Sequence, residues 1–213
     1  MQHFLNALKT QRWDDHRYYH HSLVNQSLHF VSAVSFLYCY LLVFKDPALA
    51  ALIAWLVSML TRQTGHFFFE PRDYDQINQA THEYKEEIKV GYNLQRKRIL
   101  MAIWALSPLL LLVDPTLHGV FEAPKGAGDL LRQIGYIWFF VGAVGFAFRI
   151  VQLFVQQDAM TALVWATKIL TDPFHDIQLY HKSPYYLLRK SKDQHGGDDE
   201  EPEIDDEPAP AAH

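Results

Sequence analysis

Four long apolar stretches constrain the fold of this chain more than any other feature. They cover residues 28–44, 48–69, 99–113 and 134–155, and each is apolar nearly all round rather than along one stripe. A helix of about 20 residues crosses a bilayer core of roughly 30 Å, and by that measure the third stretch is short. We therefore expect an all-α, polytopic integral membrane helical bundle with about four spans. A buried helical bundle in a soluble protein is the alternative.

Lysine and arginine residues gather on one side of the expected spans. They lie before the first stretch, between the second and third, and after the fourth, whereas the loops on the other side hold only Lys45, Lys125 and Arg132. Under the positive-inside rule, both termini and the middle loop are then cytoplasmic. The expected location is the inner membrane of a bacterium or, in a eukaryote, the endoplasmic reticulum.

The C-terminal end differs in composition from the rest of the chain. The net charge of −5 comes largely from an acidic run within residues 198–207 that is interleaved with prolines. Such a run is typical of disorder, so we expect a membrane domain over residues 1–190 and a disordered acidic tail over residues 191–213. No basic face with interleaved aromatic residues is visible, which argues against nucleic-acid binding. The sequence leaves the oligomeric state open.

Histidines are the main candidates for chemistry, because the single cysteine, Cys39, excludes a thiolate metal site. In the expected topology most of them lie at or near the cytoplasmic interface, and His118 lies on the other side. Metal-competent side chains at one depth favour a site. The interfacial set comprises His16, His20, His21, His29, His66, His82, His175 and His181.

The first motif runs from Tyr19 to His29 and leads into the first apolar stretch. In one continuous helix, His20 and His29 would lie roughly 13 Å apart along the axis and could not share a metal. Ser22 is a suitable N-cap, so we expect a helix to begin near Leu23. The break lets His20 fold back toward His29. The alternative is a set of histidines that only reach the interface.

The second motif, residues 65–71, closes the second apolar stretch. His66 and Glu70 are spaced i, i+4, which places them on one helix face about 6 Å apart and suits two ligands of one ion. Pro71 is expected to end the helix.

A third cluster, residues 171–181, follows the fourth stretch. His175 and His181 are possible additional ligands, as is His21, and Asp172 or Asp176 can orient a ligating imidazole. An amphipathic interfacial segment is an equally good interpretation of this cluster. His82 is more simply a surface residue.

The first two motifs together resemble the small membrane family typified by the fungal iron-dependent 2-hydroxy fatty acid dioxygenase. The resemblance covers residues 19–70, through Tyr19-His20, Asn25, His29 and the run from Gly65 to Glu70. Family members commonly carry an Asn-Pro pair after the first histidine and an Arg-Pro-Ala run after the glutamate. This chain has other residues at both places, and the resemblance does not explain residues 74–189.

The resemblance implies an all-helical membrane enzyme that uses Fe(II) and dioxygen to shorten a 2-hydroxy fatty acid by one carbon. His20, His29 and His66 would hold the iron, and Glu70 and Asn25 would be catalytic, with Glu70 also a possible ligand. Histidines with a carboxylate and open positions are what non-haem Fe(II) oxygenases require. The alternatives are a di-iron lipid hydroxylase or desaturase, and a non-catalytic membrane protein that binds lipid or acts as a scaffold. Hydrolase, phosphate-loop and dinucleotide motifs are missing from the sequence.

Overall fold

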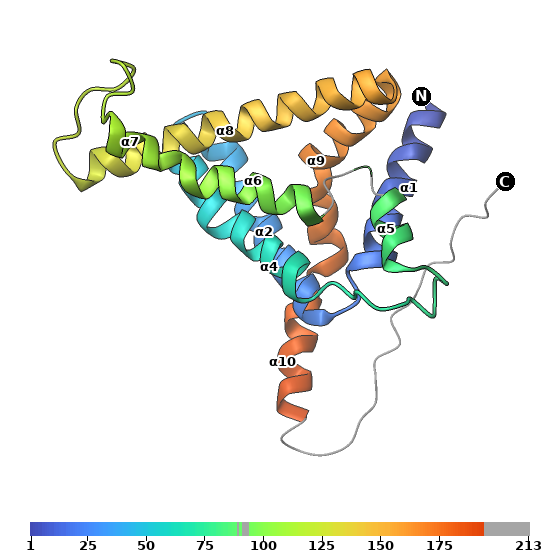
Figure 1. Ribbon diagram of the computed structural model, residues 1–213. Helices are drawn as coiled ribbons and strands as arrows, with labels where there is room; N and C mark the ends of the chain where they lie inside the picture. Colours follow the sequence, from blue (N-terminus) through green and yellow to red (C-terminus); the bar gives the residue numbers. More distant parts are fainter. Residues whose placement is uncertain (89, 91–93, 194–213) are drawn as a thin grey trace.

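The computed structural model describes residues 1–88, 90 and 94–193, and in this part of the chain every regular element is a helix (Figure 1). The nearest approach to a sheet is an isolated bridge between Asp75 and Ala80. The expected all-α class is therefore confirmed.

The helices fall into two groups along the chain. The first half contains α1 (Gln2–Tyr19), α2 (Leu23–Leu42), α3 (Pro47–Ile53), the π-helical η1 (Ala54–Met59), α4 (Leu60–Phe68) and α5 (His82–Ile88). The second half contains α6 (Leu94–Leu106), the 3-10 turn η2 (Ser107–Leu109), α7 (Leu110–Val113), α8 (Ala127–Gln156), α9 (Ala159–Tyr180) and α10 (Ser183–Asp193).

Side-chain caps begin three of the helices that carry the fold. The hydroxyl of Ser22 accepts a hydrogen bond from the Asn25 backbone N–H, so the predicted break and N-cap at the start of α2 are confirmed. Asp46 caps α3 in the same way, with Pro47 in the first turn, and Asp158 caps α9.

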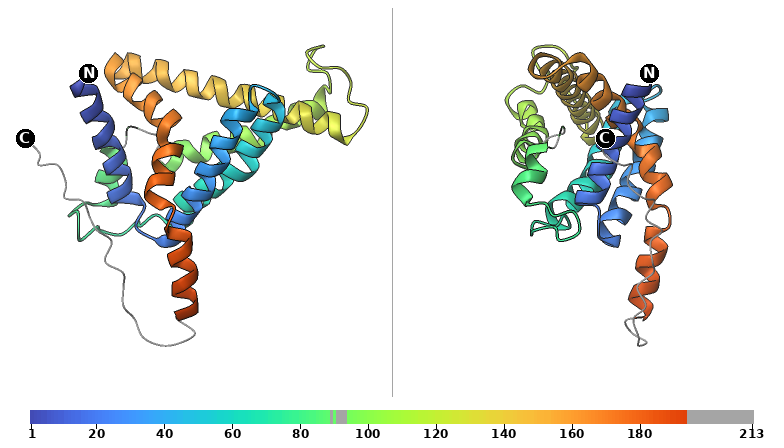
Figure 2. Two further views of the ribbon diagram at one scale, coloured as in Figure 1. Left: turned by 180° about the vertical axis from the view of Figure 1, so that it is seen from behind. Right: turned by 90° about the vertical axis from the view of Figure 1, so that its right-hand side faces the viewer.

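The second helix lies at the centre of the bundle. It contacts the α3–η1–α4 rod and α9, while α8 crosses over α3 and turns back into α9 (Figures 1 and 2). Gly135 permits the α8–α3 crossing, because a Cβ atom there would lie 2.4 Å from the carbonyl oxygen of Ala48. Two reciprocal hydrogen bonds join α6 to α8: each indole N–H of Trp104 and Trp138 donates to the other residue's carbonyl oxygen.

The four apolar stretches differ in how regular their helices are. The first and fourth form most of α2 and α8, the second is distorted by the π-helical turn, and the third is interrupted by the 3-10 turn at Pro108. Among the described helices, α8 is the one long and apolar enough to cross a membrane by length and composition, which is weak evidence for a membrane protein.

The first residues assigned to the tail are helical. Residues 191–193 continue α10, because a helix begun at Ser183 tolerates the lysine and serine that follow. The remainder of that expectation, residues 194–213, lies outside the described residues.

Candidate metal centre

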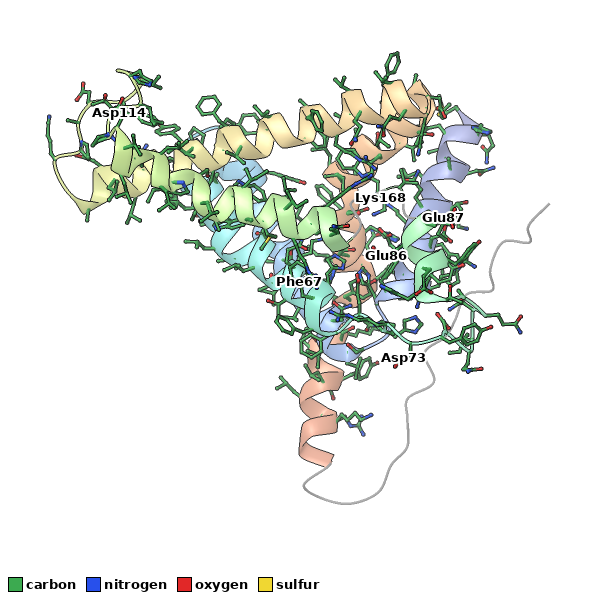
Figure 3. All side chains as sticks on the ribbon, viewed as in Figure 1. Phe67, Asp73, Glu86, Glu87, Asp114 and Lys168 are labelled. Atoms are coloured by element: carbon green, nitrogen blue, oxygen red, sulfur yellow. The ribbon has the colours of Figure 1, made fainter. Side chains whose placement is uncertain are left out.

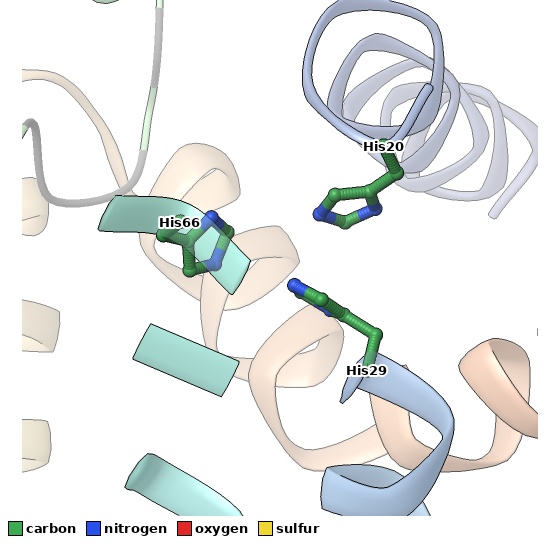
Figure 4. Close-up of side chains that lie close together, drawn as sticks. All are labelled: His20, His29 and His66. Atoms are coloured by element: carbon green, nitrogen blue, oxygen red, sulfur yellow. The ribbon is translucent and has the colours of Figure 1, made fainter. Parts of the chain in front are cut away.

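Three histidines meet where the end of α1 approaches α2 and α4. His20 is the C-cap of α1, His29 lies in the second turn of α2, and His66 lies in the last turn of α4. The ring centroids are 4.0 Å apart for His20 and His29, 4.9 Å for His29 and His66, and 5.7 Å for His20 and His66 (Figure 4). One nitrogen from each ring lies within 4.8 Å of the others, so this group can hold a metal ion.

The link between α1 and α2 brings His20 back over α2. Asn25 donates through Nδ2 to the carbonyl oxygen of Tyr19 at 2.9 Å, and Gln26 donates to that of His20 at 2.9 Å. Both amides thus bind backbone groups that the end of α1 leaves open. In the structure, the hydrogen bond of Asn25 thus holds the link between α1 and α2, one helical turn before His29.

A glycine allows α4 to come close enough for His66 to join the other two. A Cβ atom on Gly65 would lie 2.2 Å from Oδ1 of Asn25 and 3.4 Å from a ring carbon of His29. The glycine next to His66 is therefore a requirement of the helix contact.

His20 is held from its outer side by Tyr180. Its Nδ1 lies 2.8 Å from the Tyr180 hydroxyl, which is also 2.9 Å from Nδ1 of His16. Its other nitrogen, Nε2, is buried with no hydrogen-bond partner in the described structure. Burial, together with the neighbouring His29, holds the pKa of His20 well below its ordinary value. The ring is therefore neutral, which is the form that binds a metal.

Asp176 takes the corresponding place beside His29. One carboxylate oxygen lies 3.7 Å from Nδ1 of His29, too long for a hydrogen bond, and 2.8 Å from the guanidinium of Arg62. Burial favours the protonated carboxyl, but Arg62 and His29 outweigh it and keep the pKa of Asp176 below its usual range. His29 thus faces a carboxylate on its Nδ1 side, and its Nε2 has no hydrogen-bond partner in the described structure.

Glu70 is the outer partner of His66. The helix ends at Phe68, so Glu70 lies past its last turn rather than on its face, and there it forms a short hydrogen bond with Nδ1 of His66. A carboxylate on Nδ1 fixes the ring and directs Nε2 to an ion. The geometry thus makes Glu70 an orienting residue. All three histidines share this pattern of an oxygen beside Nδ1.

No protein-family model, curated protein or solved structure matches this chain.

The other candidate histidines lie away from the three-histidine group. His21 is partly exposed, with its ring 3.9 Å from Asp75, and His181 hydrogen-bonds to the Gln178 carbonyl at the end of α9. His175 lines a separate small cavity on the α1 side of α9. His118 is exposed in the loop after α7, beside Asp114, at the far end of the molecule (Figure 3).

One face of α9 supports the site, and only its two aspartates are identified from the sequence. Its polar residues are spaced by four positions, at Lys168, Asp172, Asp176 and Tyr180, and all four are buried. Lys168 pairs with Asp172 at 2.6 Å and with Asp15 of α1 at 2.5 Å (Figure 3). Burial alone would lower the pKa of Lys168, but the two carboxylates raise it. The regular spacing was the signal available in the sequence.

A cavity of about 350 Å³ opens beside the histidines. His20 and His66 line one part of it, and apolar side chains, among them Phe36, Leu100 and Trp104, line another. Pockets of this size and character bind small molecules that have an apolar body.

Proposed function

We propose that this chain is a membrane non-haem Fe(II) oxygenase acting on a lipid-like 2-hydroxy acid. The observation that carries the proposal is a buried group of three histidines beside an apolar cavity. Three nitrogen ligands suit iron among other transition metals and leave positions for further ligands. The order of the motifs between Tyr19 and Glu70, similar to that of the 2-hydroxy fatty acid dioxygenases, favours iron.

His20, His29 and His66 would hold the metal. Bound there, Fe(II) would supply the coordination positions for a hydroxyl–carboxylate chelate and for dioxygen. Tyr180 and Glu70 keep the rings of His20 and His66 in place through hydrogen bonds from their outer sides, and the carboxylate of Asp176 faces the outer side of His29. The apolar walls of the cavity exclude water and accept an acyl chain.

Exposed apolar faces support the membrane part of the proposal. Along α8, Phe140, Val144, Phe148, Val151 and Val155 form an exposed stripe. Similar exposed residues continue over α6 and α7, and soluble monomers rarely leave such large apolar areas in water. We extend the proposal to four membrane spans. The α2–α3 turn and the α7–α8 loop would lie on one side of the membrane, and the histidines would lie toward the other side.

A mononuclear centre is the version that the structure favours. A di-iron enzyme would need His175 and His181 as further ligands, and both lie outside the three-histidine group. A non-catalytic lipid-binding protein also remains a candidate, because the cavity can hold an apolar chain whether or not a metal is bound.

Metal analysis combined with turnover tests the proposal. Protein purified in mild detergent should contain about one iron per chain and consume dioxygen when given a 2-hydroxy fatty acid. Replacing His29 with alanine should remove both properties, whereas His118→Ala should retain both because its side chain is exposed far from the site. Zinc in place of iron, or full turnover by His29→Ala, would contradict the proposed chemistry.

A further inference from the structure

One residue that lines the cavity beside the histidines is a buried lysine with no ion pair among the described residues. The side chain of Lys85, in α5, is fully buried and lines the cavity. Its Nζ has no hydrogen-bond partner in the described structure, and no ion pair is found for it there. An ammonium group removed from water is costly unless it is paired, and buried charges in proteins are paired as a rule.

Two other cations that line the cavity are already neutralised. Lys168 lies between Asp15 and Asp172, and Arg62 lies against Asp176 and Asp172. Among the described residues, the fold therefore places carboxylates within ion-pair distance of Lys168 and Arg62, whereas Lys85 has only the longer-range attraction of Asp75. The difference indicates that the partner of Lys85 comes from outside the chain.

The position of Lys85 is tied to the metal centre. The hydroxyl of Tyr19 donates to the carbonyl oxygen of Lys85 at 2.6 Å, and the next residue in the chain is His20. Tyr19, His20 and Lys85 all line the same cavity. A ligand in this space thus lies beside Lys85 and the histidines together, with apolar side chains around the rest of it.

From these observations we infer that Lys85 binds the anionic group of an apolar-chain ligand in the cavity. This deepens the proposed function by giving its substrate acid a charge partner in the protein, and it rests on that function only for the identity of the acid. A carboxylate and a phosphate ester offer the same charge. Probes with the same number of carbon atoms and different head groups can therefore distinguish the two.

Binding can be followed by the fluorescence of Trp104 and Trp165, which line the cavity. The full chain, in nanodiscs of uncharged phosphatidylcholine, is titrated with dodecanoic acid, dodecanol and dodecyl phosphate. The wild type should prefer dodecanoic acid to dodecanol by about tenfold or more, the range of one charge-assisted contact. Lys85→Met should abolish this preference without changing the affinity for dodecanol, and Lys85→Arg should retain part of it.

Thermal unfolding without ligand separates a binding role from a structural one. Lys85→Met should raise the melting temperature, because it removes an unpaired buried charge. The matched change Lys168→Met should lower it, because Asp15 and Asp172 would lose their shared partner. A lowered melting temperature for Lys85→Met, or unchanged preference for the acid, would overturn the inference.

The remaining outcomes distinguish this inference from the proposed function. Metal content is recorded for each variant, and Lys85→Met should keep its metal. A Lys85-dependent preference in protein that binds no metal would leave the inference standing and remove the oxygenase. Preference for dodecyl phosphate over dodecanoic acid would support Lys85 as the anion site and identify a phosphate-bearing lipid as its ligand.

Discussion

At the scale of single residues, Tyr180 is the contact that joins the three-histidine group to the C-terminal part of the chain. Its hydroxyl lies within hydrogen-bond distance of both His20 and His16. With a metal on Nε2 of His20, Nδ1 would carry the hydrogen and donate a hydrogen bond to the Tyr180 hydroxyl. The hydroxyl hydrogen is then directed to Nδ1 of His16. Burial raises the pKa of Tyr180, so it stays a neutral phenol and can serve in both roles.

Replacing Tyr180 with phenylalanine should weaken metal binding about 10- to 100-fold, the usual cost of losing an outer partner of a ligating histidine. Competition with a calibrated chelator measures the affinity. Tyr185→Phe is the matched control, because Tyr185 is exposed on α10 and should leave the affinity unchanged. Equal affinities for the two variants would contradict a positioning role for Tyr180.

The sequence predicts part of this site for a clear reason. His20 and His29 are related by a local break whose cap, Ser22, can be recognised, and His66 has Glu70 four residues later. Tyr180 and Lys85 carry no such local signal, since their importance comes from contacts with residues 160 and 66 positions away. Long-range contacts of this kind require the fold.

At the scale of helices, the close contact between α2 and α4 sets the spacing of His29 and His66. Gly65→Ala would place a methyl group against Oδ1 of Asn25, which the contact with Tyr19 holds in place. This clash can be relieved only if α2 and α4 move apart. We expect a loss of metal affinity and a destabilisation of about 1–3 kcal/mol, as is usual when a packed interface is overfilled.

Gly145→Ala is the control for that change. An added Cβ atom at Gly145 of α8 would meet its nearest neighbour, a Leu100 methyl carbon, at 3.8 Å, an ordinary contact. Alanine is favoured over glycine in a helix by about 1 kcal/mol, so this variant should be at least as stable as wild type. Chemical denaturation and metal content, measured on both variants, separate helix propensity from helix contact. Retention of metal by Gly65→Ala would show that α2 and α4 tolerate a wider spacing.

Helix positions were easier to predict than their regularity. The apolar stretches mark α2 and α8, but nothing in residues 54–59 indicates the π-helical turn. For α9, which begins after the fourth apolar stretch, the sequence leaves an orienting role for Asp172 or Asp176 and an interfacial segment equally open. Its four-residue polar spacing becomes informative only once α9 is seen to pack along α2.

At the scale of the whole molecule, the connections predicted to face away from the cytoplasm lie together. The α2–α3 turn and the loop between α7 and α8 are at the same end of these helices (Figures 1 and 2). An ion pair of 2.7 Å between Asp46 and Arg132 joins the start of α3 to the start of α8. The histidines lie toward the opposite ends of α2 and α4, an arrangement compatible with the topology expected from the basic residues.

Cysteine labelling tests that topology. In a Cys39→Ser background, which removes the buried native thiol, single cysteines are placed at the exposed positions Gln2, Lys125 and Lys190. A membrane-impermeant maleimide should label Gln2→Cys and Lys190→Cys from the cytoplasmic side and Lys125→Cys from the other. Four spans require this pattern, because an even number of crossings returns the chain to its starting side. Labelling of Gln2→Cys and Lys125→Cys from one side would contradict the four-span topology, because three crossings between them would put them on opposite sides. The site would then have to be placed relative to the bilayer by α8 alone, the one described helix whose length and composition suit a crossing.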